Sequence, residues 1–385
     1  MKAPFQKFAY GVVVLMFLLL SCKIQERPNL RQTIELKGEW QLKLDTAGVG
    51  IAQKWYNQKF TDKLFLPGTL DQNKKGFQAN DSSTLHLTRV YYYYGAAWFK
   101  HEVIIPISWK DKHIELIMER TKVSHVWIDS VSVGSNNHIS VSQVYDLTNY
   151  LTAGKHAITI MVDNNIKLVP VGGSHAYSDD TQTNWNGIIG RFYLEASNPT
   201  RIVMAKAYPE IYDKLVNVEL HIQNPGIRLK EAVVTIEAEL WNLPKKDKIP
   251  ENKYELNLST KDTIIKLTYA LVPKAQLWSE YNPALYKLSV TLSDKEKSLD
   301  NISLNFGLSE FKVHNTQFTI NDTKVFLRGK HDGCVFPLTG YPPMDVKEWI
   351  RIFKIAKMYG INHYRFHSWC PPEAAFMAAE MTGMY

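Results

Sequence analysis

Cysteine is scarce in this chain of 385 residues, which contains three, at positions 22, 334 and 370. Three cysteines in a chain of this length do not make the disulfide framework that stabilises small secreted domains. Their spacing fits no zinc site, and no glycine-rich loop that would cradle a phosphate group is present. We therefore expect neither a bound metal ion nor a cofactor.

A strong charge excess is missing as well. The formal net charge of +7 is modest for this length, and no run of basic residues is interleaved with aromatic ones. These features argue against a nucleic-acid partner, whereas they leave an acidic substrate open.

The chain also lacks an apolar run long enough for a confident membrane span, which takes about 20 residues. Its amino terminus carries Lys2 and Lys7 and then a shorter apolar run at 8–20, typical of a secretory signal peptide. The run ends in Leu-Leu-Ser-Cys22, which resembles a bacterial lipobox, in which the cysteine is acylated.

We therefore expect a lipoprotein signal peptide at 1–22, lipidation of Cys22 and a polar tether at 23–31. The protein would be exported and held at a bacterial membrane, facing the periplasm or the cell surface, by its acyl chains alone. The alternative is a signal peptide cut nearby, with Cys22 incidental.

Apolar and aromatic residues, by contrast, are abundant. Hydrophobic residues make up 45% of the chain, which contains 10 Trp, 20 Tyr and 16 Phe. This content is enough to build packed cores and argues against disorder. The length leaves room for two or three domains.

Alternation of apolar and polar residues predicts a mainly β fold with two sandwich domains. From 32 to 198, segments such as 39–44 and 113–118 alternate with the period of two that a half-buried strand requires. Because no long amphipathic helix interrupts this region, we predict a jelly-roll β-sandwich. Residues 199–308 alternate in the same way and predict an immunoglobulin-like β-sandwich.

The period changes after residue 308. An apolar strand at 325–329 is followed by a helix between the N-cap candidate Asp345 and Gly360, then by a second strand at 361–366 and another helix start. This order predicts the first two β/α units of a TIM (β/α)8 barrel at 309–385. A closed barrel takes roughly 250 residues. Because only about 75 follow Phe311, we expect an incomplete barrel.

Polar side chains crowd the expected carboxyl ends of these two strands, where the sites of α/β barrels form. After the first strand come Arg328, His331 and Asp332, and after the second come Arg365, His367, Ser368 and Trp369. We expect them to bind substrate. The alternatives are that the arginines form structural ion pairs, that backbone groups satisfy the histidines, and that Trp369 packs in the wall.

Several segments, in their order along the chain, resemble glycoside hydrolase family 2, the group of β-galactosidases, β-glucuronidases and β-mannosidases. These segments are 36–40 (LKGEW), 94–99 (YGAAWF), 184–191 (NWNGIIGR), 277–286 (LWSEYNPALY) and 326–332 (FLRGKHD). The resemblance spans nearly everything after the tether. It implies that the sandwich at 32–198 is a sugar-binding domain. It also implies a β-galactosidase-like enzyme that cleaves terminal β-glycosidic bonds of an oligosaccharide or polysaccharide. Trp369 would stack on a sugar face, because an aromatic ring suits apolar C–H surfaces.

Two departures from the family's pattern leave the sugar open, because 330–333 reads KHDG instead of NRHE and 367–371 reads HSWCP instead of SHYP. Retention in this family uses two glutamates from later barrel strands. The resemblance therefore implies that no catalytic residue is present and that this chain alone is inactive. Asp332 and Glu373 are the only carboxylates near the two strand ends, and we do not expect them to replace the pair.

Two further interpretations stay open. One is a non-catalytic carbohydrate-binding surface lipoprotein, and the other is a purely structural surface module. A polar loop at 174–185 either reaches over the barrel mouth or is simply solvated. The sequence leaves the oligomeric state open.

Overall fold

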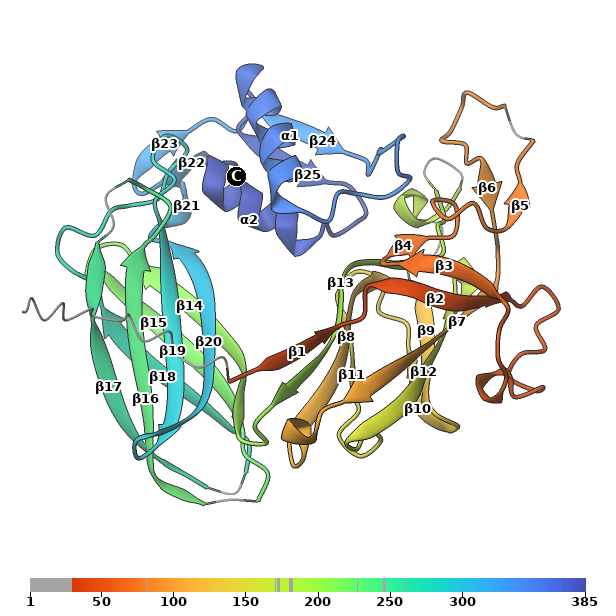
Figure 1. The fold of residues 1–385 in the computed structure, drawn as a ribbon. Helices are drawn as coiled ribbons and strands as arrows, with labels where there is room; N and C mark the ends of the chain where they lie inside the picture. Colours follow the sequence, from red (N-terminus) through yellow and green to blue (C-terminus); the bar gives the residue numbers. More distant parts are fainter. Residues whose placement is uncertain are drawn as a thin grey trace, which may run out of the picture.

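The computed structural model describes residues 30–80, 82–169, 171, 174–179, 183–226, 228–244, 247–259 and 261–385. The expected signal peptide, the lipidation site Cys22 and nearly all of the tether lie outside these residues. Within the described part of the chain, no helix has the length and apolar character needed to cross a membrane. Two β-sandwiches lie side by side, and a smaller α/β segment lies across one end of both (Figure 1).

The first sandwich consists of two antiparallel sheets around one apolar core. Trp40 and Leu42 are buried on the inner face of β2, whereas Glu39 is exposed, as strand alternation requires. One sheet has the order β1-β13-β8-β11, with β4 paired to β13, and the other β10-β9-β12-β7-β2-β3. The bounds are β1 Gln32–Glu35, β2 Gly38–Leu44, β3 Asp62–Leu66, β4 Gly68–Thr69, β7 Ala96–Ile105, β8 His113–Thr121, β9 Val123–Ile128, β10 Val131–Asn136, β11 Gln143–Asp146, β12 Gly154–Asp163 and β13 Gly187–Ser197.

The loops of this sandwich carry the remaining short elements. A two-stranded hairpin projects from it on the side that faces the α/β segment (Figure 1). Its strands are β5 Phe77–Gln78 and β6 Tyr91–Tyr92, and single 3-10 turns lie at Trp55–Asn57, Ile107–Trp109, Ile166–Leu168 and His175–Tyr177.

The second sandwich packs a three-stranded sheet, β14-β15-β18, on a four-stranded sheet, β17-β16-β19-β20. The predicted alternation is present, since Val216, Val218 and Leu220 of β15 are fully buried. The mainly β fold predicted from the sequence is thus confirmed. The bounds are β14 Arg201–Glu210, β15 Leu215–Gln223, β16 Leu229–Leu240, β17 Lys248–Leu258, β18 Thr263–Ala270, β19 Leu285–Asp294 and β20 Lys297–Gly307.

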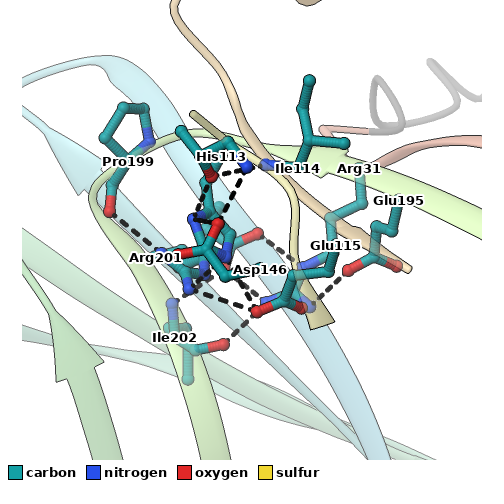
Figure 2. Close-up of polar contacts among 11 residues, drawn as sticks. Arg31, His113, Ile114, Glu115, Asp146, Glu195, Pro199, Arg201 and Ile202 are labelled. Atoms are coloured by element: carbon teal, nitrogen blue, oxygen red, sulfur yellow. Dashed lines mark hydrogen bonds and ion pairs between the residues drawn. The ribbon is translucent and has the colours of Figure 1, made fainter. Parts of the chain in front are cut away.

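Ion pairs join the two sandwiches, and Figure 2 shows the polar contacts at this junction. The Arg31 guanidinium donates to Glu195 of β13 at 3.0 Å and, across the junction, to both carboxylate oxygens of Asp300 of β20 at 3.0 and 2.8 Å. Asp300 is fully buried. Because a buried carboxylate needs a partner, Arg31 couples the first strand of one sandwich to the core of the other.

The α/β segment begins with a small antiparallel sheet of β21 Phe311–His314, β22 Gln317–Ile320 and β23 Thr323–Val325. Then come β24 Gly329–Asp332, α1 Val346–Met358, β25 His363–Phe366 and α2 Glu373–Thr382. The β24 and β25 strands run parallel and pair Gly329 with His363 and Asp332 with Phe366. Two β/α units therefore follow the sandwiches, in the predicted order.

Local signals explain the helix bounds. The Asp345 carboxylate accepts the backbone N–H of Glu348 at 2.8 Å, and Gly360 takes the left-handed conformation (φ 76°) just after the helix. The Glu348 carboxylate pairs with Arg351 on the next turn. The predicted N-cap and C-terminal stop of α1 are thus confirmed.

The first strand of this segment was predicted wrongly. The apolar residues at 325–327 are divided between the end of β23 and a connection, so that β24 starts only at Gly329. Arg328 consequently precedes the strand instead of following it. A short apolar run cannot specify its own bounds, because its pairing partners decide where the strand begins.

Candidate functional site

The carboxyl ends of β24 and β25 lie next to each other and are linked through one carbonyl group. The Asp332 carbonyl oxygen accepts the backbone N–H of His367 at 2.8 Å and the indole N–H of Trp369 at 3.1 Å. Five of the seven predicted substrate-binding residues therefore gather at or beside this edge, namely His331, Asp332, His367, Ser368 and Trp369, and Arg365 lies one position before the end of β25.

Alternation divides these side chains between two faces of the parallel pair. His331 stands opposite Arg365 in the register, and both are exposed. The His367 ring lies edge-on to that of His331, with 4.6 Å between ring centroids. His331, Arg365 and His367 thus share the face that the helices leave open, and we call this face the histidine–arginine face.

Asp332 points the other way, toward the helices. Its carboxylate accepts the Lys330 ammonium at 2.7 Å and the backbone N–H of Cys334 at 3.0 Å, and it is buried. The Lys330 ammonium also lies 4.9 Å from the centre of the Tyr364 ring, which packs on Phe353 of α1. The Asp332 carboxylate therefore organises the loop after β24 and lies away from the histidine–arginine face.

Trp369 packs on the side of the helices, whereas Ser368 lies against the first sandwich. The half-buried Trp369 ring contacts the rings of Phe336 and Phe366, with centroids 6.2 and 5.2 Å away. Ser368 is exposed and takes the left-handed conformation (φ 58°), which turns its carbonyl oxygen toward the first sandwich. There it accepts the hydroxyl of Ser174 at 2.9 Å.

Arg328 lies at the opposite end of β24 and does not join the site. Its guanidinium donates to the carbonyl oxygen of Phe326 at 3.3 Å and to the Glu280 carboxylate at 3.4 Å. The same carboxylate accepts the side-chain amide of Asn362 at 3.0 Å. Because Glu280 belongs to the second sandwich, Arg328 ties the amino-terminal edge of the parallel pair to that sandwich.

The first sandwich forms a side wall of the site through its loop at 174–185. Besides the Ser174 contact, the Thr183 hydroxyl bonds to the Gly340 carbonyl oxygen, and the Trp185 ring lies 6.2 Å from that of Tyr341. Residues 180–182 of this loop lie outside the described part of the chain. The described part of the loop thus reaches the loops that follow β24 and β25.

Two charged residues of the first sandwich reinforce this contact. Glu119 of β8 is buried and accepts the backbone N–H of Arg191 at 2.8 Å and its Nε at 3.1 Å. The Arg191 guanidinium continues to the Glu373 carboxylate in the first turn of α2. The carboxylates near the strand ends that the sequence pointed to, Asp332 and Glu373, are therefore both held by cations.

A buried lysine lies at the same contact. Lys122 connects β8 to β9 and is 4% exposed, and its ammonium lies 4.6 Å from the Trp185 ring and 5.6 Å from the Tyr177 ring. Burial lowers its pKa to about 7, a shift that Arg89 strengthens and Cys334 opposes. Burial, with the charge of Asp332, raises the pKa of the Cys334 thiol to about 12.

Sequence reasoning missed Glu119, Lys122 and Arg191. Glu119 and Arg191 occupy positions at which a strand of a sandwich ordinarily faces solvent, and Lys122 lies between two strands. A charged residue near a strand end is too common to mark an interface. Only docking of the α/β segment makes these three residues part of a site.

An open groove of about 630 Å³ lies on the outer side of the loop after β24, between the first sandwich and α1. Its lining is mainly apolar and includes Ile189, Val335, Pro337, Met344 and Ile352. None of the predicted substrate-binding residues lines it. Among the described residues, no cluster of three or more His, Cys, Asp or Glu side chains is arranged to hold a metal ion.

A raised carboxyl pKa occurs away from the site. Burial, helped by the charge of Glu373, raises the pKa of Glu380 to about 7. Glu380 lies near the end of α2, where its carbonyl oxygen accepts the indole N–H of Trp278 from the second sandwich at 2.7 Å. The backbone of Glu380 thus joins α2 to the second sandwich.

Both sandwiches match descriptions of one known protein family. Residues 33–194 match the family description "Glycosyl hydrolases family 2, sugar binding domain", and residues 200–308 match "Glycosyl hydrolases family 2". A β-glucuronidase of Paenibacillus borealis is 22% identical over 372 residues, which cover 92% of this chain and 58% of that protein. The β-glucuronidase of Homo sapiens is 24% identical over 369 residues, which cover 89% of this chain and 54% of that protein.

Other relatives match a smaller part of the chain. A β-galactosidase of Staphylococcus xylosus is 24% identical over 221 residues, which cover 56% of this chain and 19% of that protein. Among solved structures, β-glucuronidase of Ruminococcus gnavus in complex with D-glucuronic acid superposes with a TM-score of 0.70 at 18% identity, covering 93% of this chain and 60% of that one. The chain spans somewhat more than half the length of the relatives that it matches from end to end.

Proposed function

Because the chain belongs to glycosyl hydrolase family 2, we propose that it forms the substrate-binding, amino-terminal part of a glycosidase that removes terminal β-linked sugars. The observation that carries this proposal is the histidine–arginine face. It places three hydrogen-bonding side chains at the end of a parallel strand pair, and the loop of a sugar-binding sandwich walls it at Ser368. Polar groups that converge at a strand end suit the hydroxyl groups of a sugar.

Within this class we propose a β-linked uronic acid as the terminal sugar. Relatives that match nearly the whole chain are named β-glucuronidases. Arg365 supports the choice, because its exposed guanidinium forms no ion pair with another described residue and so suits an anionic partner. That partner is a uronate carboxylate or a catalytic glutamate. A β-galactoside is the second candidate, since β-galactosidases are also among the relatives.

The mechanism that we propose is retention through two carboxyl groups. One protonates the leaving oxygen while the other attacks the anomeric carbon, which requires a separation of about 5 to 5.5 Å. Asp332 and Glu373 do not fit these roles, because Lys330 and Arg191 hold them. We therefore propose that both catalytic glutamates come from β/α units that follow Tyr385 in a longer parent enzyme.

An assay of this chain on 4-nitrophenyl β-D-glucuronide and β-D-galactoside tests the proposed division of roles. We expect no turnover, together with weak binding of methyl β-D-glucuronide measured by saturation-transfer NMR. Arg365→Gln should abolish that binding, whereas Arg228→Gln on the second sandwich should leave it unchanged. Turnover by the chain itself would show that a catalytic pair is present after all. Coding DNA beyond Tyr385 should continue into a barrel with two glutamates.

A non-catalytic carbohydrate-binding protein is the second candidate function. It is favoured by the engagement of both nearby carboxylates with cations. The two candidates differ in the coding DNA after Tyr385, because the second requires no further β/α units. A stop codon directly after Tyr385, with sugar binding intact, would favour it over the glycosidase.

We also propose that the protein is exported and anchored through lipid on Cys22, as the lipobox-like segment indicates. In bacteria grown with labelled palmitate, the full chain should incorporate the label and sediment with membranes. Cys22→Ser should lose both properties, whereas Cys370→Ser should keep them. Label that persists on Cys22→Ser would contradict the anchor.

A further inference from the structure

Three aromatic rings on the projecting hairpin are exposed to solvent. The run Tyr91–Tyr94 leads from β6 toward β7, and alternation turns Tyr93 into the core, where its hydroxyl donates to the Ala96 carbonyl oxygen at 2.9 Å. Tyr92 and Tyr94 are turned outward and are 37% and 53% exposed. Phe77 of β5, which pairs with Tyr92, is 52% exposed. We call these three residues the aromatic strip.

The strip has a defined geometry. The ring centroids of Phe77 and Tyr92 are 5.9 Å apart, and those of Tyr92 and Tyr94 are 6.0 Å apart. The ring planes are inclined by 47° and 51°, so the rings are not stacked on one another. Gly76 permits the close approach of the hairpin, because its φ is 105° and a Cβ atom there would lie 2.4 Å from the Tyr92 carbonyl oxygen.

Hydrogen bonds attach the strip to the loop that walls the candidate site. The Tyr94 hydroxyl bonds to the Asp179 carboxylate, which also accepts the Arg89 guanidinium at 3.1 Å. The same guanidinium donates to the Asn184 carbonyl oxygen at 3.3 Å, and the Arg89 side chain is buried. The loop that contains these residues reaches Ser368 through Ser174. The strip is therefore continuous with the edge of the site.

The chemistry of the strip suits a saccharide. An exposed aromatic patch rimmed by polar groups marks a binding surface, and tyrosine combines an apolar ring face with a hydroxyl group. A pyranose chain presents the matching groups, namely C–H faces and hydroxyls. The surrounding domain also matches a sugar-binding family description.

We propose that the aromatic strip binds the part of an oligosaccharide or polysaccharide chain that continues beyond the sugar held at the histidine–arginine face. This inference rests on the proposed glycosidase function and extends it, because it specifies a polymeric substrate instead of a small glycoside. The strip then adds binding energy remote from the reacting bond.

Titration calorimetry on the full chain tests the strip with two kinds of probe. The small probes are methyl β-D-glucuronide and methyl β-D-galactoside. The long probes are a hexasaccharide of alternating β-linked glucuronic acid and N-acetylglucosamine, and β-1,4-linked galactohexaose. We expect one of the long probes to bind on the order of tenfold more tightly than its methyl glycoside, or about 1.4 kcal/mol.

The combined change Phe77→Ala with Tyr92→Ala should remove this advantage and leave methyl glycoside binding unchanged. Tyr94 stays in place because its hydroxyl holds Asp179. The matched control is Tyr208→Ala, which removes an equally exposed tyrosine from the second sandwich (50% exposed) and should change nothing. Circular dichroism verifies that each variant is folded.

The possible results distinguish a failure of the strip proposal from a failure of the proposed glycosidase function. The proposal for the strip is overturned if each hexasaccharide binds no more tightly than its methyl glycoside. It is also overturned if the double variant keeps full affinity for the hexasaccharide. Hexasaccharide binding that depends on the strip while no methyl glycoside binds supports the strip and weakens the proposed function. Self-association that is lost in the double variant without any change in saccharide affinity would show that the strip is a contact between copies, which also overturns the proposal.

Discussion

Replacing Lys122 with methionine is expected to stabilise the protein at neutral pH. The lysine is 4% exposed and forms no ion pair with a described residue, and its pKa falls from 10.5 in the unfolded chain to about 7 in the folded protein. Between these values the unfolded chain binds the proton and the folded protein releases it, so stability rises with pH. Methionine keeps the length of the side chain without a charge.

The expected change in the free energy of unfolding follows from the pKa shift of Lys122. One unit of pKa corresponds to about 1.4 kcal/mol, so that the lysine destabilises the folded state by about 4 kcal/mol at pH 7 and by about 2 kcal/mol at pH 9. The advantage of Lys122→Met should therefore shrink by about 2 kcal/mol across this interval. The rings of Trp185 and Tyr177 near the ammonium reduce the gain, because they stabilise the charged form.

The free energy of unfolding of the first sandwich is measured in urea at pH 7 and pH 9. Hydrogen exchange of the amides in β8 and β9 reports this unfolding. Comparing the variant with the wild type at each pH cancels the contributions of other titrating groups to stability. Cys334 is one of these groups, because its raised pKa makes stability fall above pH 9. Lys63→Met, at an exposed lysine paired with Glu39, is the control and should shift stability by less than about 0.5 kcal/mol. A Lys122→Met protein that is less stable at pH 7, or whose advantage is the same at both pH values, would refute the reasoning.

Three further outcomes follow from the contacts between the segments. Arg31→Ala leaves the buried Asp300 carboxylate without its guanidinium and should lower stability by about 3 kcal/mol, measured by thermal unfolding; an unchanged midpoint would mean that the junction is solvated. Arg191→Ala should loosen α2 from the first sandwich and speed proteolysis of the α/β segment, while Arg191→Lys should restore part of the resistance, and equal cleavage of all three proteins would contradict this role. Iodoacetamide at pH 8 should label the exposed Cys370 and spare Cys334, which is buried and whose pKa is raised, and peptide mapping that finds both labelled would show that the loop after β24 opens.

The elements of this fold could largely be predicted from short-range patterns. The alternation at 216–222 reappears as the buried face of β15, and Asp345 with Gly360 bounds α1 as predicted. These signals work because strand burial and helix capping depend on neighbours within a few residues. The bounds predicted for the first strand of the α/β segment were wrong, because pairing with β25 decides where β24 begins and the apolar run does not.

The candidate site was predictable in composition and not in arrangement. His331, Arg365 and His367 were placed near the strand ends, and alternation brings them to one face. The same alternation turns the Asp332 carboxylate toward the helices, and the late start of β24 carries Arg328 to the other end. A shift of one or two residues in a strand thus decides whether a side chain meets the site.

By itself, the sequence determined the order of two sandwiches and two β/α units, because periodicity and caps are local properties. Its motifs also indicated the family. Tertiary structure alone decided which partner each buried charged group meets, namely Arg31 for Asp300, Arg191 for Glu119, and the Trp185 ring for Lys122. The aromatic strip likewise exists only once the hairpin folds and Tyr93 turns inward. Burial and partners depend on residues far apart in the chain, and no local pattern records them.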